Sequence, residues 1–380
     1  MSRSVHCLNK ISKVGLNVLP SNYKVSETLD ESVSAILVRS AVMHEMALPS
    51  SVECVARAGA GVNNIPLEDL AKKGVVVFNT PGANANAVKE LVIAMMLLAA
   101  RDLRGSMEWV KANKEDPEIN KTMEKAKAQF AGTEILGKTL GVIGCGAIGA
   151  LVADSAKKLG MKVVAVEPSK ATLERNAHLL EDVEIVSIDE LYERSDYVTI
   201  HVPLMDATKG MLNKDAFAKM KDGVIIINAA RDALVNDDDL KVALEIGKVR
   251  KYVTDFPNAK TANMEGVVAI SHLGASTEEA EDNCAVMAVN QISEYLDHGN
   301  IVNSVNYPNL RLDSAKGVRV VVLYELREGI ANDVLESVKE CGVNAFVSGE
   351  KGKFGATLLD LAKEPKDITV NGVTKVLIVK

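Results

Sequence analysis

Three glycines with a fixed spacing give the clearest chemical signal in the chain. They stand in LGVIGCGAIG (140–149) as Gly144-x-Gly146-x-x-Gly149, between an apolar run and the helical pattern ALVADSAKKLG. In such a strand–turn–helix, the first glycine permits a tight turn and the second lets a pyrophosphate approach the backbone. The third lets the helix pack against the strand. The segment therefore predicts a site that holds phosphate groups on backbone N–H groups at a helix N-terminus.

A carboxylate at the end of the next apolar run indicates which nucleotide is held. Glu167 closes the run KVVAVE (162–167). A carboxylate at this place accepts hydrogen bonds from both ribose hydroxyls and repels a 2′-phosphate. NAD is therefore the expected cofactor, in preference to NADP. Ala147 and Ile148, which lie inside the glycine turn, are expected beside it.

Four further apolar runs also end in residues that can do chemistry. These residues are His201 after DYVTI, Arg231 after GVIIINAA, Asp255 after KYVT and His272 after VVAIS. Open α/β sheets bind their ligands beyond the carboxyl ends of the strands. An arginine directly after an apolar strand is also costly unless its charge is used. The pattern predicts one ligand site along one edge of a doubly wound sheet.

Three zones of the chain must position these residues. Residues 1–98 alternate short apolar strands with helical segments, which favours an α/β unit with a parallel sheet. Residues 99–284 carry the six strand ends, and their polar segment 107–130 is expected to form a solvated helix or linker. Residues 317–380 show a strand, a helix and three more strands, which suggests a ferredoxin-like α+β module.

Composition argues against several other classes of protein. The net charge of −7 disfavours a nucleic-acid partner, because phosphate binding needs a basic face. The longest apolar run, LVIAMMLLAA (91–100), is too short to span a bilayer, and MSRSVHCLNK lacks the apolar core of a secretion signal. The cysteines include no C-x-x-C pair, so we expect reduced thiols, a cytoplasmic location and no metal site. They are Cys7, Cys54, Cys145, Cys284 and Cys341.

Five longer segments make the chain resemble the D-2-hydroxyacid dehydrogenases. They are VARAGAGVNNIPLEDLAKKGVVVFNTPGANANAVKELVIAMMLLAAR, GKTLGVIGCGAIG, HVPLMDATKGMLN, MKDGVIIINAARDALVN and ISHLGASTEEAEDN. The resemblance around them extends over nearly all of residues 30–305. The resemblance implies two Rossmann-like doubly wound domains with a substrate cleft between them. The catalytic domain would be 1–98, completed by 285–305, and the NAD-binding domain would be 99–284.

The resemblance also assigns roles on the nucleotide side. Oxidation of a 2-hydroxy acid moves hydride from C2 to the nicotinamide and a proton from the hydroxyl to a base. His272 matches the family's acid/base, which suits an imidazole that titrates near neutrality. Arg231 matches the arginine that grips the substrate carboxylate through two parallel hydrogen bonds. Asp255 matches the residue that binds the nicotinamide amide. Further cofactor contacts are expected from His201, Val202, Pro203, Thr208, Ala229, Ala230, Gly274 and Ala275.

On the substrate side, the resemblance implies four residues. Ala60 and Gly61 match a loop whose backbone N–H groups receive the carboxylate, and Asn84 matches an asparagine beside cofactor and substrate. Arg39 matches the arginine that phosphoglycerate-oxidising members aim at the phosphate. Its alternative interpretation is a surface arginine at a strand end.

One position departs from the family pattern. The family places a glutamate about five residues after the Asp255 position, where it stabilises the protonated histidine, but this chain has Lys260. A cation near His272 would disfavour the protonated ring. Three explanations stay open: Glu265 substitutes for the glutamate, Lys260 points to solvent and leaves His272 working alone, or catalysis has been lost.

The C-terminal module resembles the ACT modules, which bind amino acids and are attached to many phosphoglycerate-oxidising members. It departs from them because LYELREGIAN offers Leu326, Glu328 and Gly329 just after the first strand, where those modules have an asparagine and a proline-glycine. In addition, KEPKDITVNG is short and broken where a second helix belongs. Two roles stay open for 317–380: feedback by serine, or a structural or subunit-pairing function.

The function that these residues and the resemblance favour is NAD-dependent oxidation of 3-phosphoglycerate to 3-phosphohydroxypyruvate, at the entry to serine biosynthesis. One alternative is a dehydrogenase of another D-2-hydroxy acid, such as glycerate. An alternative of another class is an NAD(H)-sensing binding protein without turnover. The resemblance implies a homodimer or homotetramer whose partner is a small-molecule substrate, without nucleic acid or membrane.

Overall fold

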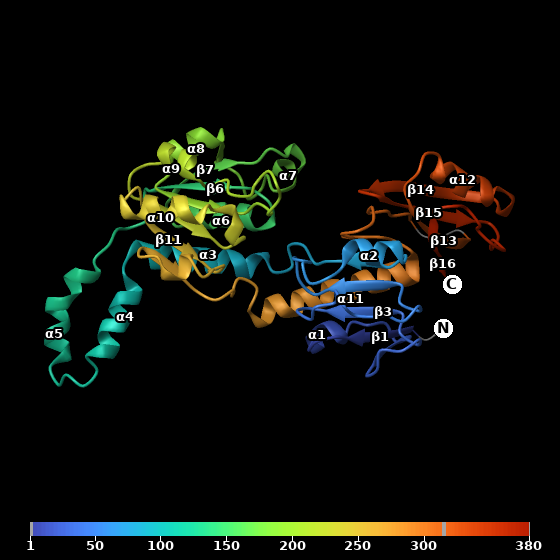
Figure 1. Cartoon of the computed structure of the whole chain (residues 1–380), viewed down its shortest axis with the longest axis horizontal. Coiled ribbons are helices and arrows are strands. Elements are labelled where there is room, and N and C mark those ends of the chain that lie inside the picture. The colour runs from blue at the N-terminus through green and yellow to red at the C-terminus, as the bar shows by residue number, and fades with distance from the viewer. Residues whose placement is uncertain (1–2, 314–316, 380) are drawn as a thin grey trace. The chain divides into compact units, whose positions relative to one another are not determined.

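The computed structural model describes residues 3–313 and 317–379, which divide into two compact units (Figure 1). The first unit runs to Asn84 and resumes at Glu278, and the second runs from Ala85 to Thr277. These boundaries differ from those expected at 98/99 and 284/285. The reason is that α3 (Ala85–Ala100) packs against the sheet of the second unit, and α11 (Glu278–His298) against that of the first.

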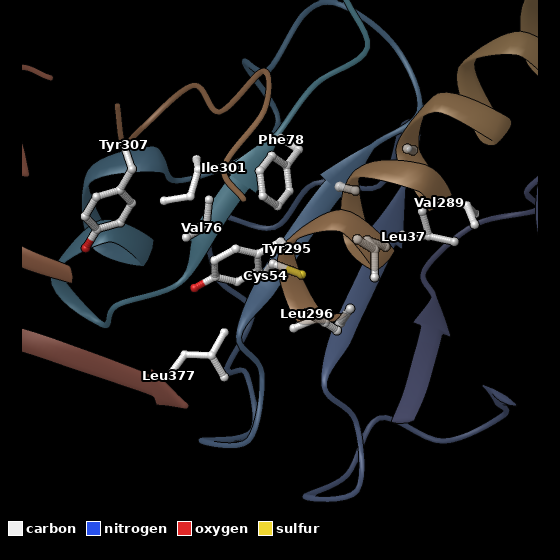
Figure 2. Close-up of a cluster of buried hydrophobic side chains, with 14 of the residues drawn as sticks. Leu37, Cys54, Val76, Phe78, Val289, Tyr295, Leu296, Ile301, Tyr307 and Leu377 are labelled. Atoms are coloured by element: carbon white, nitrogen blue, oxygen red, sulfur yellow. The ribbon is translucent and has the colours of Figure 1, made fainter. Parts of the chain in front are cut away.

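Within residues 3–84, five parallel strands form the sheet of the first unit in the order β2-β1-β3-β4-β5. The strands are β1 (Arg3–Cys7), β2 (Tyr23–Ser26), β3 (Ala35–Val38), β4 (Cys54–Arg57) and β5 (Val76–Phe78), and the helices are α1 (Lys13–Leu16) and α2 (Leu67–Lys72). The apolar face of α11 covers one side of this sheet (Figure 2). Its contribution includes Cys284, Ala288, Val289, Ile292, Tyr295 and Leu296.

Within residues 85–277, seven parallel strands are ordered β12-β11-β10-β9-β6-β7-β8. They are β6 (Thr139–Ile143), β7 (Lys162–Val166), β8 (Glu184–Ile185), β9 (Tyr197–Ile200), β10 (Val224–Asn228), β11 (Val249–Thr254) and β12 (Val267–Ala269). One face is covered by α3 and α6 (Ala147–Lys158). The other is covered by α8 (Ile188–Arg194), α9 (Lys214–Lys219) and α10 (Asp237–Glu245), while α7 (Lys170–Arg175) follows β7. The strand order reverses between β6 and β9, where doubly wound sheets bind nucleotides.

The polar segment 107–130 lies in a pair of helices that extends from the second unit (Figure 1). They are α4 (Leu103–Ala112) and α5 (Ile119–Ala126), and among their residues only Ala126 is buried. Apolar side chains are nevertheless exposed on them, namely Leu103, Met107, Val110 and Met123. The predicted solvated helix is therefore a helix pair that also presents apolar surface.

Within residues 317–379, an antiparallel sheet is ordered β14-β15-β13-β16. Its strands are β13 (Val318–Glu325), β14 (Val343–Lys351), β15 (Phe354–Leu361) and β16 (Val373–Val379), with one helix, α12 (Ile330–Ser337). Alternate residues of β13 face two different cores. Val320 and Val322 pack with α12, whereas Val321 and Leu323 join the core around α11. No helix in the described part of the chain is long and apolar enough to cross a membrane.

A buried ion pair joins this sheet to α11. Arg319 of β13 pairs with Asp360 of β15, and their side chains are 3% and 6% exposed. The guanidinium also donates to the carbonyl of His298, at the end of α11, over 2.8 Å. Because the guanidinium is buried away from water, loss of its carboxylate partner costs far more stability than loss of a partner in a surface ion pair.

We expect Asp360→Ala to lower the free energy of unfolding by about 3–5 kcal/mol, because it leaves a buried guanidinium unpaired. The control is Asp333→Ala, which breaks the exposed pair of Arg327 and Asp333 and should cost about 0–1 kcal/mol. Urea unfolding of both variants measures the difference. Equal, small losses would show that Arg319 does not depend on this carboxylate.

Candidate active site

The glycine turn has the three geometries that its spacing predicts. Gly144 has φ +92°, and a Cβ there would lie 2.8 Å from the carbonyl oxygen of His201. A Cβ at Gly149 would lie 1.9 Å from the carbonyl oxygen of Gly144, so α6 and β6 approach too closely for any side chain. At Gly146, by contrast, a Cβ would meet no described protein atom within 4 Å. The turn is open only where a pyrophosphate would approach.

The residues around the turn leave donors and acceptors for a nucleotide. Gly146 caps α6 without a side chain, so the first-turn N–H groups keep their capacity to bind an anion. Glu167 accepts the N–H of Cys145 and that of Ser169 on its two oxygens, each at 2.9 Å. A carboxylate can accept about four hydrogen bonds. Glu167 is therefore fixed beside the turn and retains acceptors for ribose hydroxyls.

His201 is held as a neutral ring. Its Nε2 lies 2.9 Å from the hydroxyl of Thr199, and its backbone N–H donates to Ile143 over 2.7 Å. Burial lowers the pKa of His201 to about 4. The loop that follows is closed by Thr208, whose hydroxyl donates to the carbonyl of Pro203 over 2.7 Å. His201 thus shapes the turn after β9 and does not exchange protons near neutrality.

Asn228, the last residue of β10, pins the turn that carries Arg231. It is fully buried, and its side-chain oxygen accepts the N–H of Ala230 at 3.0 Å. Its amide donates to the carbonyl of Arg231 over 2.8 Å and to the hydroxyl of Tyr252 over 2.9 Å. The backbone of the turn from Ala229 to Arg231 is therefore held from inside the protein.

Asp255 presents a buried acceptor that lacks a donor. The residue is 1% exposed, and its Oδ2 accepts the N–H of Gly274 at 3.1 Å. Its Oδ1 is buried without a hydrogen-bond partner among the described residues, and burial raises the pKa of the carboxyl. Buried polar atoms are normally satisfied. An orphan oxygen here suits the amide N–H of a bound nicotinamide.

Arg231 and His272 meet at one aromatic ring. The imidazole of His272 lies with its centroid 4.2 Å from that of Phe256, and the rings are tilted by 43°. The guanidinium carbon of Arg231 lies 5.1 Å from the same ring centroid. The two residues expected to handle the proton and the carboxylate are therefore neighbours within the second unit.

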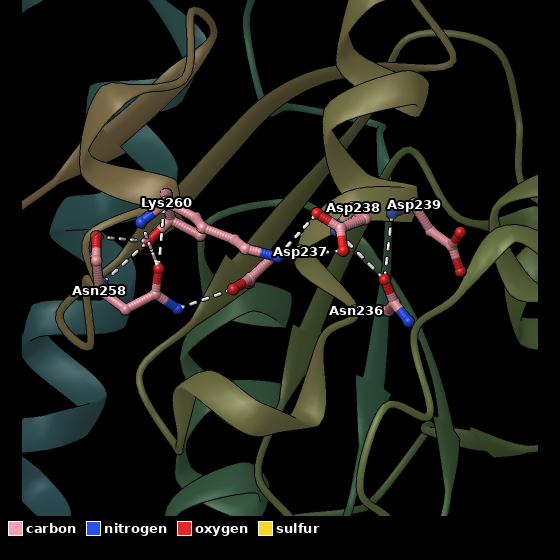
Figure 3. A network of polar contacts seen from close by, with 7 residues as sticks. Asn236, Asp237, Asp238, Asp239, Asn258 and Lys260 are labelled. Atoms are coloured by element: carbon pink, nitrogen blue, oxygen red, sulfur yellow. Dashed lines mark hydrogen bonds and ion pairs between the residues drawn. The ribbon is translucent and has the colours of Figure 1, made fainter.

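Lys260 is turned to another partner. Its ammonium lies 2.8 and 3.0 Å from the two carboxylate oxygens of Asp238, which lies in the first turn of α10 and donates its N–H to the Asn236 cap (Figure 3). Glu265 is exposed and lines, together with Lys260 and Asp238, a groove of about 800 Å³ on the second unit. His272 does not line this groove. Of the three explanations, the observed contacts favour the one in which Lys260 points away from the histidine, and the role of Glu265 stays a prediction.

Two arginines end adjacent strands in the first unit. Arg39 follows β3, and Asn9 fixes its loop by accepting the N–H groups of Arg39, Ser40 and Ala41 at 3.2, 3.0 and 2.9 Å. Arg57 ends β4 and donates to the carbonyl of Arg39 over 3.2 Å. The guanidinium of Arg39 pairs with Glu281 of α11 at 2.7 Å. The ends of β3 and β4 therefore carry two arginines, and the guanidinium of Arg39 is paired with the carboxylate of Glu281.

The loop expected to receive the substrate carboxylate is held by its neighbours. Asn79 donates to the carbonyl of Ala60 over 2.6 Å, and the N–H of Thr80 donates to Gly59 over 3.1 Å. Gly59 has φ +154°, and a Cβ there would meet the Arg57 guanidinium at 1.9 Å. Gly61 follows in the same loop, and its role and that of Asn84, the last residue before α3, stay predictions.

Comparison with known proteins agrees with this geometry. The family model of the D-isomer specific 2-hydroxyacid dehydrogenase NAD-binding domain matches residues 93–274. A hydroxypyruvate reductase of Thermotoga maritima is 36% identical over 255 residues, which are 65% of this chain and 78% of that protein. A D-3-phosphoglycerate dehydrogenase of Methanocaldococcus jannaschii is 31% identical over 365 residues, 94% of this chain and 63% of that protein. A crystal structure of a glyoxylate reductase from Paecilomyes thermophila has a TM-score of 0.66 at 25% identity, covering 80% of this chain and 98% of that one.

The chain belongs to the D-isomer specific 2-hydroxyacid dehydrogenase family. The predicted family, the NAD-dependent dehydrogenase class and NAD as cofactor are thereby confirmed. The chain spans less than two thirds of the archaeal D-3-phosphoglycerate dehydrogenase that it matches over most of its own length.

Five residues of this dehydrogenase were not predicted from the sequence. Asn228 and Asn79 gave a usable signal, since each is a polar residue directly at the end of an apolar strand. Arg57 stands in the same kind of position at the end of β4. Phe256 and Glu281 gave none, because an aromatic ring or a helix carboxylate becomes informative only when its neighbours are known. The residues are Asn79, Arg57, Asn228, Phe256 and Glu281.

The neutral state of His201 predicts an acid-sensitive fold. Its pKa of about 4 in the folded protein lies below the ordinary value of 6.5, so the unfolded chain takes up the proton first as pH falls. Stability contributed by the neutral ring is complete above pH 6.5 and is lost between pH 6.5 and about 4, by roughly 3 kcal/mol in all.

We expect His201→Asn to be less sensitive to acid than the wild type over this range, although less stable at pH 7. Thermal unfolding from pH 7 to pH 4 measures the effect, with His178→Asn, at an exposed side chain of the same unit, as control. Parallel pH curves for wild type and His201→Asn would contradict the neutral assignment.

Proposed function

We propose that this dehydrogenase oxidises 3-phosphoglycerate to 3-phosphohydroxypyruvate with NAD, the first step of serine biosynthesis. The observation that carries the choice of substrate is the pair of arginines at the ends of β3 and β4. A phosphate dianion is matched by adjacent guanidinium groups, each able to form charge-assisted hydrogen bonds. An unphosphorylated hydroxy acid has no phosphate to bind both guanidinium groups.

The proposed proton and carboxylate chemistry uses His272 and Arg231. His272 accepts the proton of the C2 hydroxyl, and Arg231 binds the carboxylate in a bidentate manner, so that the hydroxyl is presented to the imidazole. Ala60 and Gly61 are proposed to offer backbone N–H groups to a substrate carboxylate. NAD, when bound, supplies the acceptor for the C2 hydride. Asp255 accepts the amide N–H of its nicotinamide on the orphan Oδ1 and thereby orients the ring.

Glu281 has a definite part in this proposal. Its carboxylate neutralises Arg39 at 2.7 Å, and both side chains are partly exposed, at 41% and 36%. A phosphate dianion carries more charge than a carboxylate and can displace it. The ion pair with Glu281 then explains how the charge of Arg39 is compensated when no phosphate is bound.

A specific observation favours a second candidate substrate. The relative from Thermotoga maritima is named a hydroxypyruvate reductase, and the chain covers 78% of it at 36% identity. Turnover of glycerate and hydroxypyruvate, without a phosphate requirement, is therefore the alternative. Several curated D-3-phosphoglycerate dehydrogenases match a larger share of the chain, 80–94%, which supports the phosphorylated substrate.

Assembly and regulation follow from surfaces within each unit. The exposed apolar residues of α4 and α5 support a homodimer or homotetramer formed through the second unit. The C-terminal sheet, which we propose to be ACT-like, contributes one face to the core around α11. That packing favours a structural role over serine feedback. The cytoplasmic location stays a prediction.

Replacing Arg39 with alanine separates the two substrates. We expect kcat/KM for 3-phosphohydroxypyruvate to fall about 10- to 150-fold, because a hydrogen bond to a charged group contributes a free energy of this size. The kcat/KM for hydroxypyruvate should change less than about threefold. NADH absorbance measures both. The control is Arg327→Ala, which removes an exposed, ion-paired arginine of the same unit.

Equal losses on both substrates would contradict the phosphate assignment. Wild-type protein that binds NADH but turns over neither 2-keto acid would instead establish an NAD(H)-binding protein without turnover.

A further inference from the structure

We propose that Phe256 is the positioning residue for the proton-transfer and carboxylate-binding groups: its ring holds His272 and Arg231 at a fixed spacing. This inference rests on the proposed function and adds a residue to it. The contacts that carry it lie within the second unit. They are the 4.2 Å ring-to-ring contact with His272 and the 5.1 Å approach of the Arg231 guanidinium.

The ring itself is well anchored. Phe256 is the second residue beyond β11, and its N–H donates to the hydroxyl of Thr254 over 3.0 Å. The preceding Asp255 is buried and bonded to Gly274, which lies two residues beyond His272. Both sides of the contact are thus tied to the paired strands β11 and β12. Phe256 is a fixed support, and it is only half-buried, so one part of the ring remains available to its two neighbours.

His272 needs such a support because its side chain is exposed. Lys260 stands at the position where the family has its carboxylate, and its ammonium is hydrogen-bonded to Asp238 at 2.8 Å. The contact that the described residues provide to the imidazole face is the ring of Phe256. An exposed imidazole without a neighbour would sample several rotamers, whereas a tilted ring contact at this distance favours one of them.

The same ring explains how His272 and Arg231 keep a constant separation. Arg231 is fixed at its backbone by Asn228, and its Nη1 donates to the carbonyl of Ala230 over 2.5 Å. Its guanidinium then lies within cation–π range of Phe256. A 2-hydroxy acid carries its carboxylate and its C2 hydroxyl on neighbouring carbons. The base and the carboxylate clamp must therefore keep a constant separation, and one ring in contact with both provides it.

An aromatic support also suits a ring that becomes charged. When His272 accepts the hydroxyl proton, the imidazolium faces the π-electrons of Phe256, an attraction that a neutral ring lacks. Arg231 is a cation at the same ring, and the buried carboxylate of Asp255 is the anion whose field reaches His272. The new positive charge therefore forms between one stabilising carboxylate and one aromatic face, with a guanidinium as the opposing group.

The test compares Phe256→Leu, Phe256→Met and Phe256→Tyr in the full chain, with Lys260→Met as control. Steady-state reduction of 3-phosphohydroxypyruvate and hydroxypyruvate gives kcat and KM, and fluorescence titration gives the Kd for NADH. We expect Leu and Met to lower kcat about 10- to 100-fold on both substrates, since misplacement by about 1 Å costs this much. The Kd for NADH should change less than twofold, because the ring contacts assigned to Phe256 are those with His272 and Arg231.

Phe256→Tyr should restore kcat to within about threefold, since it keeps the ring, and Lys260→Met should leave kcat unchanged. Wild-type kcat in both Leu and Met variants would overturn the proposal. So would a loss in the Tyr variant as large as in the Leu variant. If the wild type itself reduces neither 2-keto acid, the proposed function fails, and the ring contact is then judged by the next measurement alone.

That measurement needs neither turnover nor a stable Leu variant. The ring protons of His272, assigned in histidine-labelled protein by their loss in His272→Gln, should show an upfield ring-current shift in the wild type. The shift should persist in Phe256→Tyr. Unshifted His272 protons in the wild type would overturn the proposal whatever the kinetics show.

Discussion

The parallel pairing of β9, β10, β11 and β12 is the constraint on which the rest of the nucleotide-side site depends. Ile200, Asn228, Thr254 and Ala269 lie in register across these strands. The residues that follow them are consequently delivered to one edge of the sheet, however far apart they lie in the chain. Asn228 then fixes Ala230 and Arg231 beyond the edge, and Asp255 accepts the N–H of Gly274. The site is built by strand register and refined by two buried polar side chains.

Buried polar groups do different work in the two units. In the second, Asn228 has its side-chain groups satisfied by the chain itself, whereas Asp255 keeps one oxygen without a described partner. Asn228 therefore shapes the backbone, whereas the role of Asp255 toward the nicotinamide stays a proposal. In the first unit, Arg319 and Asp360 satisfy each other and hold the C-terminal sheet to the end of α11. Burial alone thus does not mark a functional residue, and neither does an unmet hydrogen bond by itself, since Tyr197 and Gln291 also have a buried side-chain oxygen without a partner among the described residues.

Much of this organisation could be predicted from local sequence. The glycine spacing and the apolar runs before Glu167, His201, Arg231, Asp255 and His272 are local patterns, and the strands lie where those runs predicted. Which sheet an apolar helix covers is not local. The helix 85–100 is apolar around much of its surface, so its pattern is compatible with either unit, and the division after residue 84 could not be predicted from it. The partners of Lys260, Arg39 and His272 were likewise invisible, because Asp238, Glu281 and Phe256 meet them only after folding.

The most direct test of the account is transfer of deuterium from NADH labelled at nicotinamide C4, with the label followed to C2 of the product by mass spectrometry. The account predicts labelled 3-phosphoglycerate from 3-phosphohydroxypyruvate with the wild type. It predicts a rate about 10²- to 10⁴-fold lower with His272→Gln at unchanged NADH affinity, the range expected for loss of an acid/base group. Label transfer at the wild-type rate without the imidazole would contradict it.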